Sequence, residues 1–570
     1  MGAGTDIKNL RLYSWGRFLL TVAAVIAAAY ILNLFRFRID LTEDKRYTLS
    51  APTHRILEKV KNDIYIQVYL DGEMPIPLKR LKRSVRELLE EFRIASDRYI
   101  DYEFINPADT KNEQQRNAQY TALYNKGLIP VDLRARDEEG GSSQKYIFPG
   151  MIINYNNIEV PVNFLNNNRS ASYEEKILHS IEGLEYEMIR TIATITSDTI
   201  YKVAFLEGQA EWPEVEVADI TLNLAKFFTV DRGAIGGKPG ILDNYAAVIV
   251  AGPSKEFSEA DKLVLDQYIM NGGKVLWLID EVAVNSDSLI NGETVGLYHP
   301  LNIQDQLFRY GARINPEIIQ DIECAMIRIS VMTGEQKQIV PAPWLYYPLL
   351  VPNQKHPLTR NLNRVKGEFV STVDTVGLDT AIRKTILLST SSFSRTLSPP
   401  MVISLKEVEQ SPERDKFIKS GLPAAVLLEG VFSSAFKNRM IASLTGDPGF
   451  RLKTSSSKTK MIIVGDGNII RNEVSRSGMN EMPLHLGQDK YTGEMFGNRD
   501  FLINCMNYLV DDNGLMELRS REMKLRLLDK TRIREYKTRL QLINIVLPVI
   551  IVILAGVIYG FVRKKAYSKD

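Results

Sequence analysis

The side chains best placed to do chemistry follow short apolar segments that read as buried strands. Four such segments end in Glu207-Gly208, Gly252-Pro253, Asp280-Glu281 and Gly465-Asp466-Gly467. Ligands of open α/β sheets bind at the carboxyl ends of the strands, so these ends are where a site is expected. Asp466 suits either of two roles, which are coordination of a cation or shaping a turn and capping the next helix.

Catalytic signatures are missing from these strand ends. None has the G-x-S-x-G nucleophile elbow, and neither Cys324 nor Cys505 follows an apolar strand as an elbow requires. Residues 233–239 lack phosphate-loop spacing, and Pro239 follows Lys238, which predicts a turn. The histidines show neither H-x-x-x-H nor H-E-x-x-H spacing, and they are His54, His179, His299, His356 and His485.

We therefore expect no catalytic residues, no cofactor site and no metal site, and the chain is predicted not to be an enzyme. A net charge of +2 argues against a nucleic-acid-binding surface. Cys324 and Cys505 cannot form a disulfide framework, and neither belongs to a CxxC motif. Two buried free thiols are expected, with a single bridge as the alternative in an oxidising compartment.

Two long apolar runs without charges lie near the two ends of the chain, at Leu19–Phe35 and Leu542–Val562. A membrane-spanning helix needs about 20 apolar residues, with a lower limit near 17. A cleaved signal peptide is the alternative for the first run, but residues 33–36 are bulky where a cleavage site has small side chains. We expect two spanning helices, with both chain ends on one side of the membrane.

Basic residues set the expected orientation. The short arms outside the two runs carry seven Lys or Arg, against nine beside the runs on the inner side. The positive-inside rule has most force in short arms, because long domains translocate largely regardless of charge. Cytoplasmic ends and an extracytoplasmic central region are therefore expected. The seven are Lys8, Arg11, Arg17, Arg563, Lys564, Lys565 and Lys569.

Alternating and helical patterns predict two α/β regions with a long helix between them. The first region reads strand–helix–strand–helix–strand–strand, and its last two strands meet at Asn156-Asn157, a hairpin signal. This order suggests a thioredoxin-like shape that, without CxxC, is a scaffold. Residues 174–196 then carry an apolar face at steps of three and four, which fits internal packing better than pairing with a partner helix. The predicted strands are 64–70, 100–105, 131–136, 145–155 and 158–164, and the predicted helices are 78–94 and 112–126.

The second region alternates apolar strands with helices, which predicts a parallel sheet covered on both faces. The strand at 461–464 is expected to rejoin this sheet or a sister sheet after a long insertion at about 285–455. A basic helix at 518–539 precedes the second apolar run and is expected to dock a partner. The predicted divisions are a cytoplasmic arm (1–18), a spanning helix (19–35), a small domain (36–170), a connecting helix (171–200), a larger domain (201–512), a basic helix (513–541), a spanning helix (542–562) and a cytoplasmic tail (563–570).

Several stretches together resemble the auxiliary, membrane-anchored components of ABC transporters. That resemblance implies a central domain similar to glutamine-amidotransferase-like folds without their catalytic cysteine. The stretches are RIDLTEDKRYTLS (38–50), VAFLEGQAEW (203–212), HPLTRNL (356–362), LLSTSSFSR (387–395), AAVLLEGVFSS (424–434), MIIVGDGNIIRNE (461–473), FGNRDFLINCMNYL (496–509) and LRSREMKLRLLDKTRI (518–533).

The resemblance also implies partners and a location. It places the chain in a bacterial inner membrane with a periplasmic domain, beside a permease and membrane lipid, in complexes of the kind that support gliding motility in Bacteroidetes. ATP hydrolysis would come from a separate subunit, because the chain has no Walker A motif. Homo-oligomerisation stays open. A ligand-binding component with a pocket between the two α/β regions is the main alternative, and an amidotransferase-like hydrolase is the third hypothesis.

Overall fold

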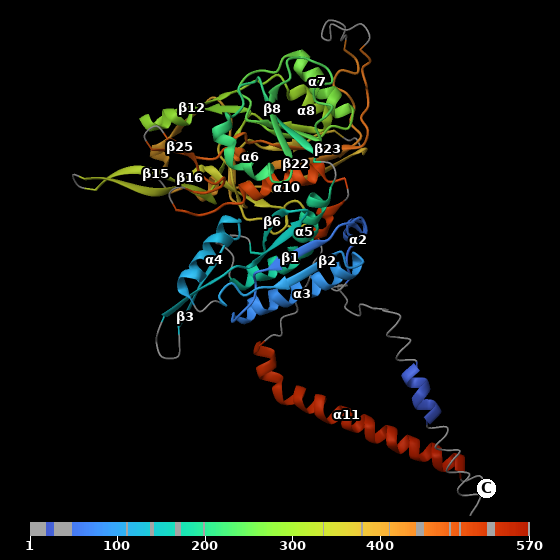
Figure 1. Cartoon of the computed structure of the whole chain (residues 1–570). Coiled ribbons are helices and arrows are strands. Elements are labelled where there is room, and N and C mark those ends of the chain that lie inside the picture. Colours follow the sequence, from blue (N-terminus) through green and yellow to red (C-terminus); the bar gives the residue numbers. More distant parts are fainter. Residues whose placement is uncertain are drawn as a thin grey trace, which may run out of the picture. The chain divides into compact units, whose positions relative to one another are not determined.

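The computed structural model divides into two units, residues 1–521 and 522–570, which we describe separately (Figure 1). Its description covers residues 19–27, 48–109, 112–136, 142–165, 173–197, 200–333, 336–377, 380–409, 411–439, 450–477, 480–489, 492–512, 514–520 and 530–567.

The first sheet of the larger unit has four strands in the order β2-β1-β5-β6. Strand β1 (Ile64–Val68) pairs parallel with β2 (Ile100–Phe104) and antiparallel with β5 (Gly150–Tyr155), which pairs antiparallel with β6 (Ile158–Asn163). Asn156 and Asn157 both have positive φ, as a two-residue hairpin turn requires, so the predicted hairpin is confirmed.

One expected strand of this region is wrong. The run 145–155 divides into β4 (Ser142–Ile147), which pairs with β3 (Val131–Arg136), and β5, which joins the main sheet. Pro149 lies at the break and has no N–H to donate to a ladder, which is why pairing changes there.

Helices complete this region. Helix α2 (Ala51–Leu57) is capped by Ser50, and α4 (Glu113–Asn125) follows β2. Helices α3 (Ile76–Ala95) and α5 (Tyr173–Thr196) pack on one another. The apolar face predicted for α5 is buried, so internal packing is confirmed for this helix. Its buried residues include Ile177, Ile181, Leu184, Met188 and Ile192.

The second sheet contains five parallel strands in the order β8-β7-β9-β10-β23. The predicted return of the chain to this sheet is confirmed, because β23 pairs with β10. Helices α6 (Ala218–Leu224), α7 (Glu259–Met270) and α10 (Asn498–Val510) accompany the strands. The strands are β7 (Lys202–Glu207), β8 (Thr229–Ala234), β9 (Ala247–Ala251), β10 (Val275–Leu278) and β23 (Thr459–Val464).

The predicted parallel sheet is confirmed for these five strands, but it is part of a larger mixed sheet. Residues 285–455, read from the sequence as an insertion, add antiparallel strands β22 (Pro423–Gly430), β19 (Ile382–Ser389) and β16 (Gln336–Pro352) beside β23. Strand β15 (Cys324–Thr333) forms a long hairpin with β16 at that end of the sheet (Figure 1). An apolar run such as AAVLL in β22 signals burial on both faces but not strand direction, which depends on distant partners.

The smaller unit contains helix α11 (Lys530–Tyr567), which joins the end of the basic segment and the apolar run 542–562 in one continuous helix. Its segment Tyr536–Lys565 contains an 18-residue window with a mean hydropathy of 2.9, and α11 is the one helix in the described part of the chain that is long and apolar enough to cross a membrane. Residues 515–520, expected to begin the basic helix, form a separate 3-10 helix, η6 (Leu515–Ser520). Of the first apolar run, residues 19–27 are helical, and residues 28–35 lie outside the described residues.

Candidate functional site

The parallel strands place a crevice at the edge where ligands of such sheets usually bind. Numbered along the chain, the five strands have the order 2-1-3-4-5, so the order reverses between β7 and β9. The connections that leave β7 and β9 diverge at this switch point, which is the usual ligand position of open α/β sheets. A cavity of about 280 Å³ lies there, lined by residues that include Trp212, Gly252, Asp280 and His299.

Trp212 closes one side of this crevice. Its indole Nε1 donates to the carbonyl of Gly467 at 2.8 Å, and its backbone N–H donates to Ala251 at 3.1 Å. The Arg471 guanidinium lies over the indole, 4.3 Å from the ring centroid. A Cβ on Gly252, where φ is +61°, would lie 2.3 Å from the indole nitrogen, so only glycine fits there. Through its indole and its backbone N–H, Trp212 therefore links the chain that leaves β7 to the ends of β23 and β9.

Asp280 and Asp466 hold the ends of β10 and β23 together. Asp280 Oδ1 accepts the Gly467 N–H at 2.7 Å, while Asp466 accepts the N–H groups of Asn468 at 2.8 Å and Glu368 at 3.0 Å. Burial raises the pKa of Asp280 to about 7, and burial with the nearby Asp280 charge raises the pKa of Asp466 well above its usual value. Asp466 thus has the contacts of a turn-shaping residue. No group of three or more His, Cys, Asp or Glu suited to a metal occurs among the residues that the structure describes.

The groups around the crevice are not arranged as a nucleophile and base. Ser254 donates its hydroxyl to the Ala210 carbonyl at 3.0 Å, and His299 Nε2 contacts the Ser254 backbone carbonyl at 3.1 Å. Both cysteines are free. Burial raises the pKa of the Cys324 thiol to about 12 and that of Cys505 well above its usual value, which disfavours the reactive thiolate.

The structure brings together all four strand ends singled out in the sequence, because β7, β9, β10 and β23 are neighbouring parallel strands. At the end of β7, the Glu207 side chain forms an ion pair with Arg232 on β8. The histidines stay apart: His356 stacks on Tyr508, and His485 lies 3.1 Å from Asp219.

Sequence reasoning did not single out Trp212 and Arg471, whose indole and guanidinium contact one another beside the crevice. A tryptophan five residues after a buried strand was a usable signal for the first, because large aromatic side chains rarely occupy exposed loop positions without a packing partner. No local sequence pattern distinguished Arg471.

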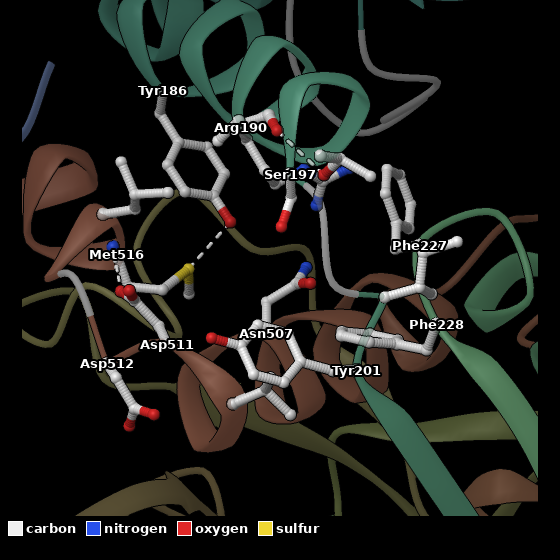
Figure 2. Close-up of a pocket in the computed structure, with 15 residues that line it drawn as sticks. Tyr186, Arg190, Ser197, Tyr201, Phe227, Phe228, Asn507, Asp511, Asp512 and Met516 are labelled. Carbon is white, nitrogen blue, oxygen red and sulfur yellow. Dashed lines mark hydrogen bonds between the residues drawn. The ribbon is translucent and has the colours of Figure 1, made fainter. Parts of the chain in front are cut away.

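A second cavity, of about 150 Å³, lies at the amino ends of β7 and β8, where α5, α10 and η6 meet (Figure 2). Tyr186 on α5 is buried and donates its hydroxyl to Met516 Sδ at 2.8 Å. Asn361 likewise contacts α5, through Glu182 at 3.2 Å. Helix α5 therefore contacts both the four-stranded sheet and segments that belong to the domain of the largest sheet.

These features define an α/β protein with two large sheets, several smaller ones and a helix at its carboxyl end that is apolar enough to cross a membrane. Residues 201–505, more than half of the chain, match the family model described as ABC-type uncharacterized transport system, and the chain belongs to this family of transport-system auxiliary components. Residues 43–154 match a domain of unknown function, DUF7088. Association with components of an ABC transporter follows from the family.

Similarities to solved structures are weak. The mmIFT52 N-terminal domain is 13% identical, with 54% of this chain and 96% of that chain covered and a TM-score of 0.31. The exo-beta-1,4-mannosidase Op5Man5 from Opitutaceae bacterium strain TAV5 is 10% identical, with 69% and 46% covered and a TM-score of 0.20. No curated protein matches the chain. TM-scores this low carry no argument about function.

Proposed function

We propose that this chain is a non-catalytic auxiliary subunit that docks the permease of an ABC transporter and holds an interaction domain beside it. Helix α11 carries the proposal. Its apolar run is exposed along its whole length, so these side chains need lipid or other membrane helices as neighbours. The apolar run is continuous in one helix with basic residues that include Lys537 and Arg539, so a membrane anchor and a basic surface belong to the same element.

The location is also part of the proposal. We place the chain in a bacterial inner membrane, with two spanning helices, both termini in the cytoplasm and the two-sheet unit in the periplasm. The short basic arms outside the apolar runs support this orientation. A separate ATPase would act through the permease, and homo-oligomerisation stays open. The sequence stretches that mark the family also resemble GldG, a gliding-motility component of Bacteroidetes, which supports a role in gliding.

We propose that the chain is not catalytic because of the geometry of the crevice. Ser254 gives its hydroxyl to a backbone carbonyl, and Trp212 occupies one wall where a substrate would approach. The strand order of the first sheet supports a thioredoxin-like scaffold without CxxC. The likeness of the larger sheet to amidotransferase-like folds stays a prediction.

Affinity purification of the full chain from membranes in mild detergent tests the proposal. We expect a permease and an ATPase to co-purify in fixed ratio. Replacing 542–562 by an unrelated spanning sequence should keep the chain in the membrane but lose the permease. As a control, the order of the exposed residues in η4 (Arg414–Lys416) is changed, because this segment lies far from α11 in the sequence. A chain that purifies alone, under conditions that preserve other transporters, contradicts the proposal.

A substrate-binding component is the second candidate, and the switch-point cavity favours it. Thermal-shift screening of the full chain against sugars, peptides and lipids tests it. A saturable hit supports this second candidate, whereas a flat screen argues against it.

A further inference from the structure

The cavity at the amino ends of β7 and β8 combines apolar walls with buried polar groups that have no partner. Tyr201 precedes β7 and Phe228 precedes β8, so their rings stand at the edge opposite the switch point. Helix α5 forms a second wall with Tyr186, and Met516 on η6 adds a third (Figure 2). The site is thus built from segments that are far apart in the chain.

Two donors lack acceptors there. Arg190 Nε on α5 and Asn507 Nδ2 on α10 are buried without a hydrogen-bond partner among the described residues. The nearest acid to Arg190 is Glu187 at 3.9 Å, which is too long for a hydrogen bond. Figure 2 shows the two side chains pointing toward one another from opposite walls. Buried donors are almost always paired, so this arrangement lacks an acceptor.

The surroundings favour a ligand with a flat or compact apolar body. The Arg190 guanidinium lies over Phe227, 4.1 Å from the ring centroid, and 5.7 Å from that of Tyr186. The volume of about 150 Å³ is close to that of a dry protein cavity known to hold benzene. A molecule the size of one aromatic ring with a small polar group therefore fits.

The acids that line the same cavity have other partners. Asp511 accepts the Met516 backbone N–H at 2.8 Å, and Asp512 pairs with Lys274 at 2.7 Å. The Arg190 guanidinium has Glu187 as an ion-pair partner at 3.9 Å, but its buried Nε has no acceptor, so an incoming acceptor meets an unpaired N–H of a charged group. A carboxylate matches a guanidinium in both geometry and charge.

We propose that this cavity binds a small carboxylic acid with a ring-sized apolar body. Its carboxylate accepts from Arg190 and Asn507, and its body packs among Tyr201, Phe227 and Phe228. The proposal does not rest on the transporter function. Because η6 is the last described element before α11, a ligand held here would bridge α5 to the segment that leads to the membrane helix.

Titration calorimetry of benzoate against the full chain in lipid nanodiscs tests this site. We expect saturable binding, with benzoate preferred at least tenfold over its neutral analogue benzamide. Arg190→Met keeps the length of the side chain and should abolish that preference, and Asn507→Leu should weaken benzoate binding about tenfold. Arg80→Met on the exposed face of α3 is the matched control and should change neither.

Ala193→Leu separates loss of binding from loss of folding. Ala193 lines the cavity on α5 without a polar group, so leucine fills the space and should block benzoate while the protein stays folded. Thermal unfolding of each variant checks its integrity. Absence of benzoate binding, equal binding of benzamide, or unchanged binding by Ala193→Leu would overturn the proposal.

Discussion

The two edges of the central sheet differ in how their buried polar groups are paired. At the carboxyl edge, Trp212, Asp280 and Asp466 each have hydrogen-bond partners that tie strand ends together. At the amino edge, Arg190 and Asn507 keep donors without acceptors. The carboxyl edge also has buried oxygens without a partner among the described residues, on Gln209, Glu211 and Glu281. The edge where α/β sheets usually bind ligands therefore keeps unpaired acceptors beside its structural contacts, whereas the unpaired groups of Arg190 and Asn507 at the other edge are donors.

The largest expected effect tests whether the carboxyl edge is structural. Gly252→Val should destabilise the protein by about 3–5 kcal/mol, because it combines a positive φ with a clash against Trp212. Urea unfolding followed by tryptophan fluorescence measures it. Gly233→Ala, in open space on β8, is the control and should cost less than about 1 kcal/mol. A stable Gly252→Val protein would mean that the crevice opens freely.

The pH dependence of the free energy of unfolding tests whether the buried carboxyl groups at the same edge have raised pKa values. The pKa of Asp280 is raised in the folded protein to about 7, so the folded state binds more protons than the unfolded state between pH 4 and 7. Stability should therefore be greatest at the acid end of this window and fall by roughly 1–3 kcal/mol as pH rises from 5 to 8. Asp280→Asn should flatten this fall.

Unfolding free energies at pH 5, 6, 7 and 8 provide the measurement for Asp280→Asn. Glu281, whose pKa is also raised to about 7 by burial, leaves a residual slope in that variant. Asp415→Asn, an exposed substitution on η4, should retain the wild-type slope. An Asp280→Asn slope equal to the wild type would show that Asp280 is ionised in the fold.

The smallest expected effect concerns the amino edge. Tyr186→Phe removes the hydroxyl that Met516 Sδ accepts and should cost only about 0.5–1 kcal/mol, because sulfur is a weak acceptor. Tyr155→Phe removes an exposed contact with Asn62 and should cost less. If Tyr186→Phe and Tyr155→Phe lower the free energy of unfolding by the same amount, the buried Tyr186 hydroxyl adds no stability to the contact between α5 and η6.

Local pattern predicted the elements whose signals lie within a short stretch of chain. The apolar face of α5, from Ile177 to Ile192, follows the helical period and is buried as expected. Ser50 caps α2, and Asn156-Asn157 turns the β5–β6 hairpin. The apolar run in α11 was equally plain, because 21 residues without a charge need no tertiary partner to be recognised.

Local sequence patterns could not predict contacts between segments that are far apart in the chain. The direction of β22 is set by β23 and β19, so a run of apolar residues could not reveal that residues 285–455 extend the sheet. Trp212 and Gly467 are 255 positions apart, and the clash that requires glycine at 252 exists only once the indole is in place.

The sequence by itself determined which segments are helical, which are apolar and which strand ends carry carboxylates, because periodicity and composition act over a few residues. Only the tertiary structure decided what those ends do. Packing brought Trp212 over Gly252, engaged Asp466 with backbone N–H groups and left one donor atom on each of Arg190 and Asn507 without an acceptor. Whether a buried polar group is satisfied depends on every segment packed around it, which no local pattern contains.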